Sequence, residues 1–381
     1  MYMNSIYVRR YHRGHPWIFS NEIINKKDIQ PDEDVVDIYR GRQFIGRGFY
    51  NPHSLIAVRI FSAEHQEFDK HFVDAMITKA FEYRSTFVTS KTFRLVYSES
   101  DGLPGLIIDR YDANYVVQIN CLGMDRRRDL AVNSLLRFDP QSIYERSDTS
   151  PRVFEGLEQR TGLLYGTLKN PFPVDLDGLN FLVDIEQGQK TGFFLDLNAI
   201  RQETRSLSNN RKVLDLFCYT GAFACYAARG GARSVTGVDS SKTAIDLAKE
   251  NCRLNGLKQI TFIDADVFDY LRTDKYTYDL IILDPPSFAK SKKTLAAARR
   301  GYRDINTQAM KHLGREGILI TTSCSHHLGE EDFRDILTKA ATDAGVNLSI
   351  IHRATQGLDH PVLLNMPESR YLKCFFLKRI N

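Results

Sequence analysis

The alternation of apolar and polar positions is most regular from about residue 211 onward. Short runs rich in β-branched residues alternate there with segments whose apolar residues recur at helical spacing, and the connections are short. This pattern predicts an α/β domain built on a doubly wound, Rossmann-like parallel sheet. Its strands are predicted at residues 213–217, 234–239, 260–263, 279–284 and 317–323.

Two more strands are predicted near the C-terminus, at residues 348–353 and 371–378, after a helix at 330–344. Only a loop joins them, whereas parallel neighbours need a longer crossover, so we expect an antiparallel pair at the sheet edge. A parallel sheet that ends in such a pair is the layout expected of a class I methyltransferase. Ser240 or Ser241 is expected to cap the helix at 243–255, and Gly314 to end another.

The first half of the chain has a different pattern. Strands are predicted at residues 35–39, 44–50 and 56–61, which suits a small β-barrel or sandwich. A helix is expected from Asp69, then strands at 93–97, 106–109 and 115–120 and a helix at 126–136. The turn-prone stretch at Pro171 and Pro173 suggests a boundary. We therefore predict a β-rich domain at 1–68, a small central α/β domain at 69–175 and the large α/β domain at 176–381.

Composition excludes several classes of protein. The 381 residues are 43% hydrophobic and 26% charged, no apolar run is long enough for a membrane span, and the N-terminus lacks a secretion signal. No two of the six cysteines have the C-x-x-C spacing of a zinc or redox site. We expect a cytoplasmic, reduced protein without a metal. The sequence leaves association into a homodimer open.

The net charge of +4 is unremarkable, but the basic residues are clustered. Clusters lie at Arg9, Arg10 and Arg13, at residues 126–128, and between Lys290 and Arg303. Any one of them is as readily a solvated face as a binding site. Three clusters in separate segments favour a polyanionic substrate, and we expect the first two to contact RNA phosphates.

Acidic residues mark the strand ends of the large domain, where open α/β sheets bind ligands. They are Asp215, Asp239, Asp264, Asp266 and Asp284. The first turn has a single glycine, Gly221, and not the G-x-G-x-x-G that admits a pyrophosphate. Asp215 can pair with a cationic amino group, Asp239 with two ribose hydroxyls and Asp266 with an adenine amino group. S-adenosylmethionine meets these demands.

The residues predicted to bind this cofactor come from four segments. They are Lys190, Thr191 and Phe194; Asp215, Phe217, Tyr219, Thr220 and Gly221; Asp239 and Ser240; and Asp266, Val267 and Asp284. Helix capping is the competing explanation for Asp264 and Asp266 taken singly. Core packing competes for the aromatic residues near Lys190.

Residues 284–288 are predicted to hold the base that is methylated. Asp284, Pro285 and Pro286 present hydrogen-bond acceptors, and Phe288 offers a stacking face. The alternative is a simple strand-terminating turn. This motif also occurs in enzymes that methylate amino groups or ring nitrogens, so it leaves the target atom open.

Cys324, at the end of the fifth predicted strand, distinguishes the targets. Carbon 5 of a pyrimidine becomes nucleophilic enough for methylation only when a thiolate adds to carbon 6. We therefore predict Cys324 as nucleophile, aided by His326 or His327, with Asp284 on ring nitrogen 3. For the other cysteines a buried apolar role is expected. No base for resolving the adduct is evident.

The chain resembles the RlmI-like bacterial methyltransferases that modify cytosine carbon 5 in 23S ribosomal RNA. The matching stretches are residues 13–19, 101–106, 190–196, 215–221, 284–288, 323–325 and 359–362. The resemblance implies an N-terminal PUA domain, a central domain that helps to hold RNA, and a C-terminal methyltransferase domain. It also implies Cys324 as nucleophile, with Asp284 in the base pocket.

Two other functions remain open on sequence grounds. One is a guanine or adenine base methyltransferase in which Cys324 is structural. The other is a non-catalytic RNA-binding assembly factor that has kept the fold.

Overall fold

The computed structural model of the protein describes residues 5–25, 34–288 and 292–381. Its chain divides into two compact units. The first comprises Met1–Val174, Val183–Leu195 and Leu358–Ser369, and the second comprises Asp175–Leu182, Asp196–Gly357 and Arg370–Asn381.

The first unit begins with a five-stranded sheet of order β1-β3-β4-β5-β2. Its strands are β1 (Ser5–Tyr7), β2 (Trp17–Ile18), β3 (Val35–Arg40), β4 (Gln43–Tyr50) and β5 (Val58–Ser62). Only β1 and β3 pair in parallel. Ile6, Val36, Ile38 and Val58 form its core. The three strands predicted here are confirmed, and β1 and β2 are too short to have been predicted from periodicity.

A second sheet of the first unit has the order β10-β9-β8-β7-β6. Its strands are β6 (Thr92–Tyr97), β7 (Leu106–Tyr111), β8 (Asn114–Ile119), β9 (Ser142–Ser147) and β10 (Arg160–Gly166). The helices are α1 (Lys70–Phe87), α2 (Leu122–Asp125), α3 (Arg128–Leu135) and α4 (Ser150–Phe154). Asp69 caps α1 by accepting a hydrogen bond from the amide of Phe72. Helix α1 buries Phe72, Val73 and Ile77 in the core.

The stretch around Pro173 differs from its prediction. Instead of a turn, the structure has β11 (Phe172–Leu176), paired with β12 (Leu179–Val183) in a two-stranded sheet. A proline is tolerated there because a strand with one neighbour has an edge that needs no donor.

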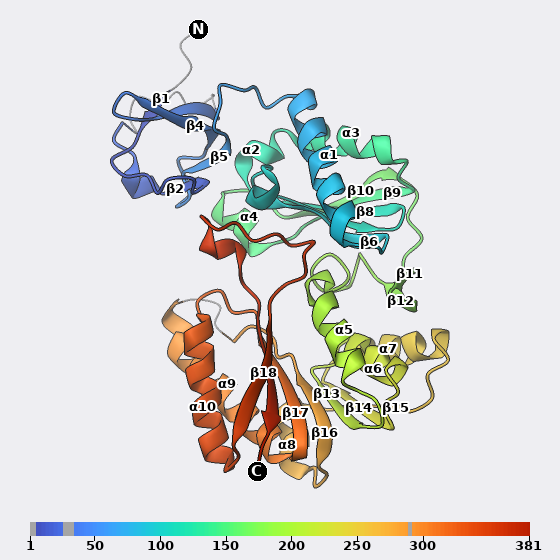
Figure 1. Ribbon diagram of the computed structural model, residues 1–381. Coiled ribbons are helices and arrows are strands. Elements are labelled where there is room, and N and C mark those ends of the chain that lie inside the picture. Colours follow the sequence, from blue (N-terminus) through green and yellow to red (C-terminus); the bar gives the residue numbers. More distant parts are fainter. Residues whose placement is uncertain (1–4, 26–33, 289–291) are drawn as a thin grey trace. The chain divides into compact units, whose positions relative to one another are not determined.

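The second unit holds a seven-stranded sheet of order β15-β14-β13-β16-β17-β19-β18 (Figure 1). The strands are β13 (Lys212–Leu216), β14 (Ser234–Asp239), β15 (Ile260–Asp264), β16 (Tyr278–Leu283), β17 (Leu313–Ser323), β18 (Leu348–Ala354) and β19 (Lys373–Arg379). The first five are parallel, and β19 runs antiparallel to both β17 and β18. The predicted antiparallel edge pair is thus confirmed.

Helices cover both faces of this sheet. They are α5 (Asn198–Ser206), α6 (Ala222–Arg229), α7 (Lys242–Leu254), α8 (Val267–Thr273), α9 (Leu295–Lys311) and α10 (Glu330–Ala344). Helices α5–α7 gather on one side and α8–α10 on the other (Figure 1). Ser241 caps α7, as one of the two alternatives predicted. Gly314 does not end a helix: α9 stops at Lys311, and Gly314 is already in β17.

Among the described residues, no helix combines the length and apolar character needed to cross a bilayer. Within the same residues, no group of three or more His, Cys, Asp or Glu side chains is arranged to hold a metal ion.

Candidate active site

The turn after β13 folds tightly against β14 and β15. Phe217, Tyr219 and Gly221 all have positive φ angles, of 60°, 47° and 75°. A Cβ atom on Gly221 would lie 2.8 Å from the ring of Phe262 and 2.9 Å from Ala248. Only glycine fits there, both in backbone conformation and in space. Gly221 then caps α6, so the turn brings backbone N–H groups to the end of the sheet.

Asp215 is fully buried beneath this turn. Its Oδ2 accepts a hydrogen bond from the amide of Ala224 at 3.0 Å, whereas Oδ1 has no hydrogen-bond partner among the residues described. Burial raises the pKa of the carboxyl well above its usual value, and the charges of Asp284 and Asp239 act in the same direction. A buried acceptor without a donor is costly, and a cationic ammonium group would satisfy it.

Asp239 ends β14 and is half-buried. Its two carboxylate oxygens accept hydrogen bonds from the amides of Tyr219 and Ser241, each at 2.9 Å. These bonds fix the carboxylate between the first two parallel strands, where a pair of ribose hydroxyls would meet both oxygens. Ser240, next in sequence, is exposed, and Thr220 is buried.

Asp266 behaves as a helix cap. It is exposed, and its Oδ1 accepts hydrogen bonds from the amides of Phe268 and Asp269, at 2.9 and 3.1 Å. The capping alternative is therefore confirmed for this residue, and a role toward adenine stays a prediction. Val267 beside it is buried in the core of the sheet.

The loop that follows β16 is tied to the end of β17. Asp284 is half-buried, and its Oδ1 accepts a hydrogen bond from the hydroxyl of Thr322 in β17. Pro285 is buried and Pro286 is exposed. The ring of Phe288 packs against Tyr302, with centroids 4.7 Å apart, so part of its surface belongs to the core and not to a ligand.

Cys324 directly follows β17, beside the end of β16. It is half-buried, whereas the other five cysteines are buried. Burial raises the pKa of Cys218 and Cys374 well above the usual value and that of Cys121 to about 12. The pKa of Cys225 is also raised well above the usual value, first by its contact with Cys252 and then by burial. These thiols are unsuited to act as nucleophiles. The structure thus brings the partly exposed cysteine and Asp284 to adjacent strand ends.

A hydroxyl chain joins the Asp284 loop to the Cys324 loop. The hydroxyl of Ser325 lies 2.9 Å from that of Ser287 and 3.0 Å from that of Tyr302. Ser325 and Tyr302 are both buried. Sequence patterns do not identify these residues, because their contacts join elements far apart along the chain.

Lys373 at the start of β19 is a further neighbour of Cys324 that the sequence did not indicate. Its side chain is buried, and its Nζ donates hydrogen bonds to the carbonyl oxygens of Ser325 and Tyr371, both at 2.7 Å. His326, predicted to assist Cys324, stacks on Tyr371 at 5.5 Å between ring centroids. Desolvation, followed by the charge of Lys373, lowers the pKa of His326.

Lys190, Thr191 and Phe194 belong to the first unit, unlike the other predicted cofactor residues. Thr191 is buried, and its hydroxyl donates to Asp109 at 2.5 Å. The ammonium of Lys190 lies 4.3 Å from the ring centre of Phe194. These contacts define an ordered segment, and its role toward the cofactor stays a prediction.

The basic clusters differ in their surroundings. Arg127 forms a bidentate salt bridge with Asp34, with hydrogen bonds of 2.7 and 3.0 Å. Arg128 forms a salt bridge with Glu145 at 3.2 Å. Arg127 and Arg128 are therefore held by ion pairs within the protein, and the predicted contact of residues 126–128 with RNA stays a prediction. Lys290 lies outside the described residues, while Arg299 and Arg303 pair with Asp332 and Asp343.

The cluster near the N-terminus is more accessible. Arg9, Arg10 and Arg13 are exposed. Arg9 and Arg10 line a hollow of about 730 Å³ together with the exposed side chains of Phe19 and Leu55. Exposed cations beside an aromatic ring suit a nucleic-acid strand.

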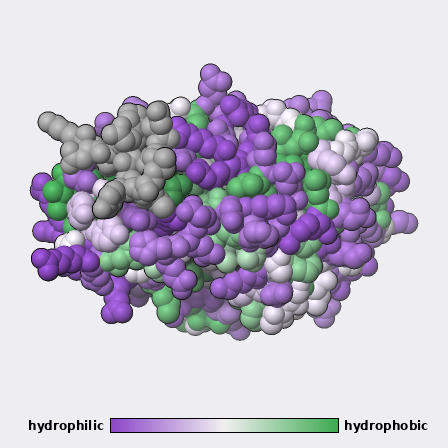
Figure 2. All heavy atoms as spheres, turned by 90° about the horizontal axis from the view of Figure 1, so that it is seen from above, coloured by the Kyte–Doolittle hydropathy of each residue, from purple (hydrophilic) through white to green (hydrophobic). Residues whose placement is uncertain are grey.

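The molecular face shown in Figure 2 is mainly hydrophilic, with its apolar residues in small separate areas.

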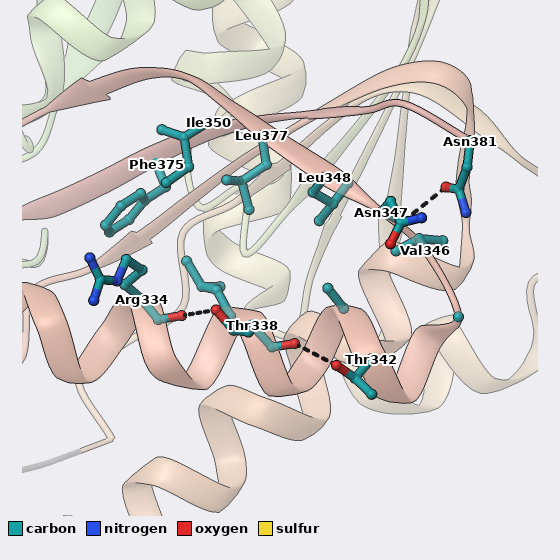
Figure 3. Close-up of a pocket in the computed structure, with 13 residues that line it drawn as sticks. Arg334, Thr338, Thr342, Val346, Asn347, Leu348, Ile350, Phe375, Leu377 and Asn381 are labelled. Carbon is teal, nitrogen blue, oxygen red and sulfur yellow. Dashed lines mark hydrogen bonds between the residues drawn. The ribbon is translucent and has the colours of Figure 1, made fainter.

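A groove at the sheet edge has a different character (Figure 3). Its volume is about 530 Å³, and it lies between α10 and strands β18 and β19, where Thr338, Leu348, Ile350 and Leu377 line it. None of its lining residues is a predicted site residue.

Comparison with known proteins decides the family. A model of S-adenosylmethionine-dependent methyltransferases matches residues 161–363, and a model of PUA-like domains matches residues 2–63. Ribosomal RNA large subunit methyltransferase I of Alteromonas mediterranea is 40% identical over 372 residues, which cover 95% of this chain and 94% of the relative. The enzyme of that name from Aeromonas hydrophila is 41% identical over 376 residues, with the same coverage. The chain belongs to this methyltransferase family.

Solved structures agree on the fold. SMU.776 complexed with SAH has a TM-score of 0.85 at 24% identity, covering 99% of this chain and all of the other. Trm5b from Pyrococcus abyssi has a TM-score of 0.53 at 14% identity, covering 71% and 73%. The predicted methyltransferase fold and PUA-like domain are confirmed, and S-adenosylmethionine is the cofactor.

Cofactor binding is expected to release protons, because a cationic amino group favours the ionised form of Asp215 and lowers its raised pKa. Affinity should therefore increase with pH through the range in which the free carboxyl titrates. Calorimetry in buffers of different ionisation enthalpy should detect up to about one proton released per cofactor. Asp215→Asn should lose that release. A wild-type protein that binds cofactor without releasing a proton would contradict this role.

Proposed function

We propose that this enzyme methylates carbon 5 of a cytosine in 23S ribosomal RNA through a covalent adduct with Cys324. The names of its relatives give large-subunit ribosomal RNA as their substrate. The observation that carries the proposal is the position of Cys324, which alone among the described cysteines is half-buried and which follows β17 beside the loop of Asp284.

The reaction needs both residues. When bound, S-adenosylmethionine supplies an electrophilic methyl group. The thiolate of Cys324 adds to carbon 6 of cytosine, which gives carbon 5 the electron density to accept that methyl group. Asp284, oriented by Thr322, holds the Watson–Crick edge of the ring. Asp215 and Asp239 hold the amino and ribose groups of the cofactor.

The N-terminal hollow is the surface that we assign to RNA phosphates. Replacing Arg9, Arg10 and Arg13 together by Ala should weaken RNA binding. The slope of log K against log salt concentration should become shallower by about 0.7–0.9 for each phosphate that is no longer neutralised. Filter binding at several salt concentrations measures both. Arg253→Ala, which removes an exposed arginine paired with Glu250, is the control. An unchanged salt dependence in the triple variant would exclude this surface.

The experiment that tests the function is mass-spectrometric mapping of 23S ribosomal RNA from cells with and without the gene. One 5-methylcytosine should disappear without the gene and return with the wild-type chain, but not with Cys324→Ala. Loss of a methylated purine would instead support the alternative in which residues 284–288 act without the cysteine. Unchanged RNA would support a non-catalytic assembly factor.

A further inference from the structure

Methylation of carbon 5 leaves a proton that must be removed before Cys324 can be released. Cys324 cannot remove it, because its sulfur is bonded to carbon 6 at that stage. A second cysteine could have this role in principle, but residues 284–288 contain none. A side chain near Cys324 that can take up a proton would fill this role.

Lys373 is held beside Cys324 by backbone pairing. It is the first residue of β19, and its Cα pairs with Ser323, the residue before Cys324. Only 6% of Lys373 is exposed. Hydrogen bonds to the carbonyls of Ser325 and Tyr371 fix the position of the Nζ atom beside the Cys324 loop. A neutral amine keeps two N–H bonds, enough for these two carbonyls, and has a lone pair left for a proton.

The surroundings of Lys373 make the neutral amine accessible. Burial is the largest influence and lowers its pKa to about 8. Of the charged groups around it, Arg370 acts in the same direction, whereas the Cys324 thiolate and Glu330 of α10 act against it. His326 lies close enough for the charge of Lys373 to lower its pKa in turn. A lysine in such a setting can exchange a proton near neutral pH.

Strand order places the cofactor residues and Cys324 on opposite sides of Asp284 in the sheet. A ring held by Asp284 at the end of β16 has β13, β14 and β15, with the cofactor residues, on one side, and β17 and β19 on the other. Delivery of the methyl group to one face of the ring and attack of the Cys324 sulfur on the opposite face would match this arrangement. Carbon 5, once methylated, would then carry its hydrogen on the same face as the sulfur, and Lys373 is held beside the Cys324 loop.

We propose that Lys373 is the base that takes the proton from carbon 5 and so releases Cys324 from the methylated cytosine. This inference rests on the proposed function. The amine of Lys373 gains the proton, the electrons of the C5–H bond form the C5–C6 double bond, and the C6–S bond breaks to return the thiolate. The resulting ammonium then gives its proton to water, which accounts for the one proton released per methyl transfer.

Two substitutions separate this role from others. Lys373→Met removes the base in a side chain of similar length, and Lys373→Arg keeps the positive charge but cannot act as a base. Both variants should methylate a single time and remain bound to natural cytosine RNA as a complex that survives denaturing electrophoresis and carries a labelled methyl group. Steady-state turnover should fall about 100-fold or more, which is the usual contribution of a general base. Lys378→Met, in the same strand but on the surface beside Glu316, should behave like wild type.

The outcomes distinguish this inference from the proposed function. If the wild type is not trapped by RNA containing 5-fluorocytosine, the proposed function itself fails. If the wild type is trapped but both Lys373 variants turn over normally, only the role of Lys373 is wrong. Normal turnover in Lys373→Arg alone would show that the charge suffices and would also overturn the base assignment.

A pH profile gives a second measurement that does not depend on the variants' folding. Turnover of the wild type should rise with pH and be half-maximal near pH 8, where half of Lys373 is in the amine form. Quenching during turnover below that pH should recover more methylated protein–RNA adduct than quenching above it. Adduct in equal amounts at both pH values would contradict the role of Lys373.

Discussion

Cys324→Ala should abolish methyl transfer, with a loss of roughly 10³-fold or more in turnover, as for removal of other covalent nucleophiles. The thiolate acts in the chemical step, so binding of S-adenosylmethionine and of RNA should be unchanged. Transfer of a labelled methyl group to 23S ribosomal RNA measures the first effect. Calorimetry and filter binding measure the others.

Cys252→Ala is the matched control for this experiment. Cys252 is buried in α7, where its sulfur lies 3.6 Å from that of Cys225. Turnover in this variant should equal that of the wild type. The stability of the fold should decrease only modestly. Undiminished turnover in Cys324→Ala would refute the covalent mechanism and favour direct transfer to a nitrogen.

Asp109→Ala should destabilise the first unit by about 3–5 kcal/mol, the cost of leaving one member of a buried ion pair alone. Asp109 is fully buried and accepts two hydrogen bonds from Arg94, both at 2.8 Å. It also accepts the bond from Thr191. Without the carboxylate, the guanidinium of Arg94 would remain buried after the loss of both of these hydrogen bonds and of its paired charge.

Urea denaturation, monitored by fluorescence and by circular dichroism, measures this decrease in the free energy of unfolding. Asp129→Ala is the control: Asp129 is 91% exposed and lies 4.0 Å from Arg128, so its removal should cost less than about 1 kcal/mol. Equal stability of the Asp109 and Asp129 variants would show that the buried pair contributes no more than a surface pair.

The large sheet could be predicted from sequence because its signals are local. Each parallel strand is a short apolar run, and helices such as α7 carry their own caps. Strands β11 and β12 could not be predicted, because Pro171 and Pro173 resemble a turn and the pairing partner alone makes the segment a strand. Gly314 was misplaced for a similar reason, since β17 extends four residues before the predicted start.

The candidate site shows the same division. Asp215, Asp239 and Asp284 could be located because parallel strands deliver their carboxyl ends to one edge. Lys373 and Tyr302 could not, because a position opposite Ser323 in β19 or beside Ser325 depends on non-local pairing. The ion pairs of Arg126 and Arg127 with Asp34 could not be predicted for a related reason, because Asp34 is distant in sequence.

The most direct test of the covalent mechanism uses 23S ribosomal RNA transcribed with 5-fluorocytidine, because fluorine cannot leave carbon 5 as a proton does. Incubation with the wild-type enzyme and S-adenosylmethionine should give a protein–RNA complex that survives denaturation. Mass spectrometry of its digest should place a methylated fluorocytosine on the peptide that contains Cys324. A wild-type enzyme that methylates natural RNA yet forms no such complex, or forms it equally in Cys324→Ala, would contradict the mechanism.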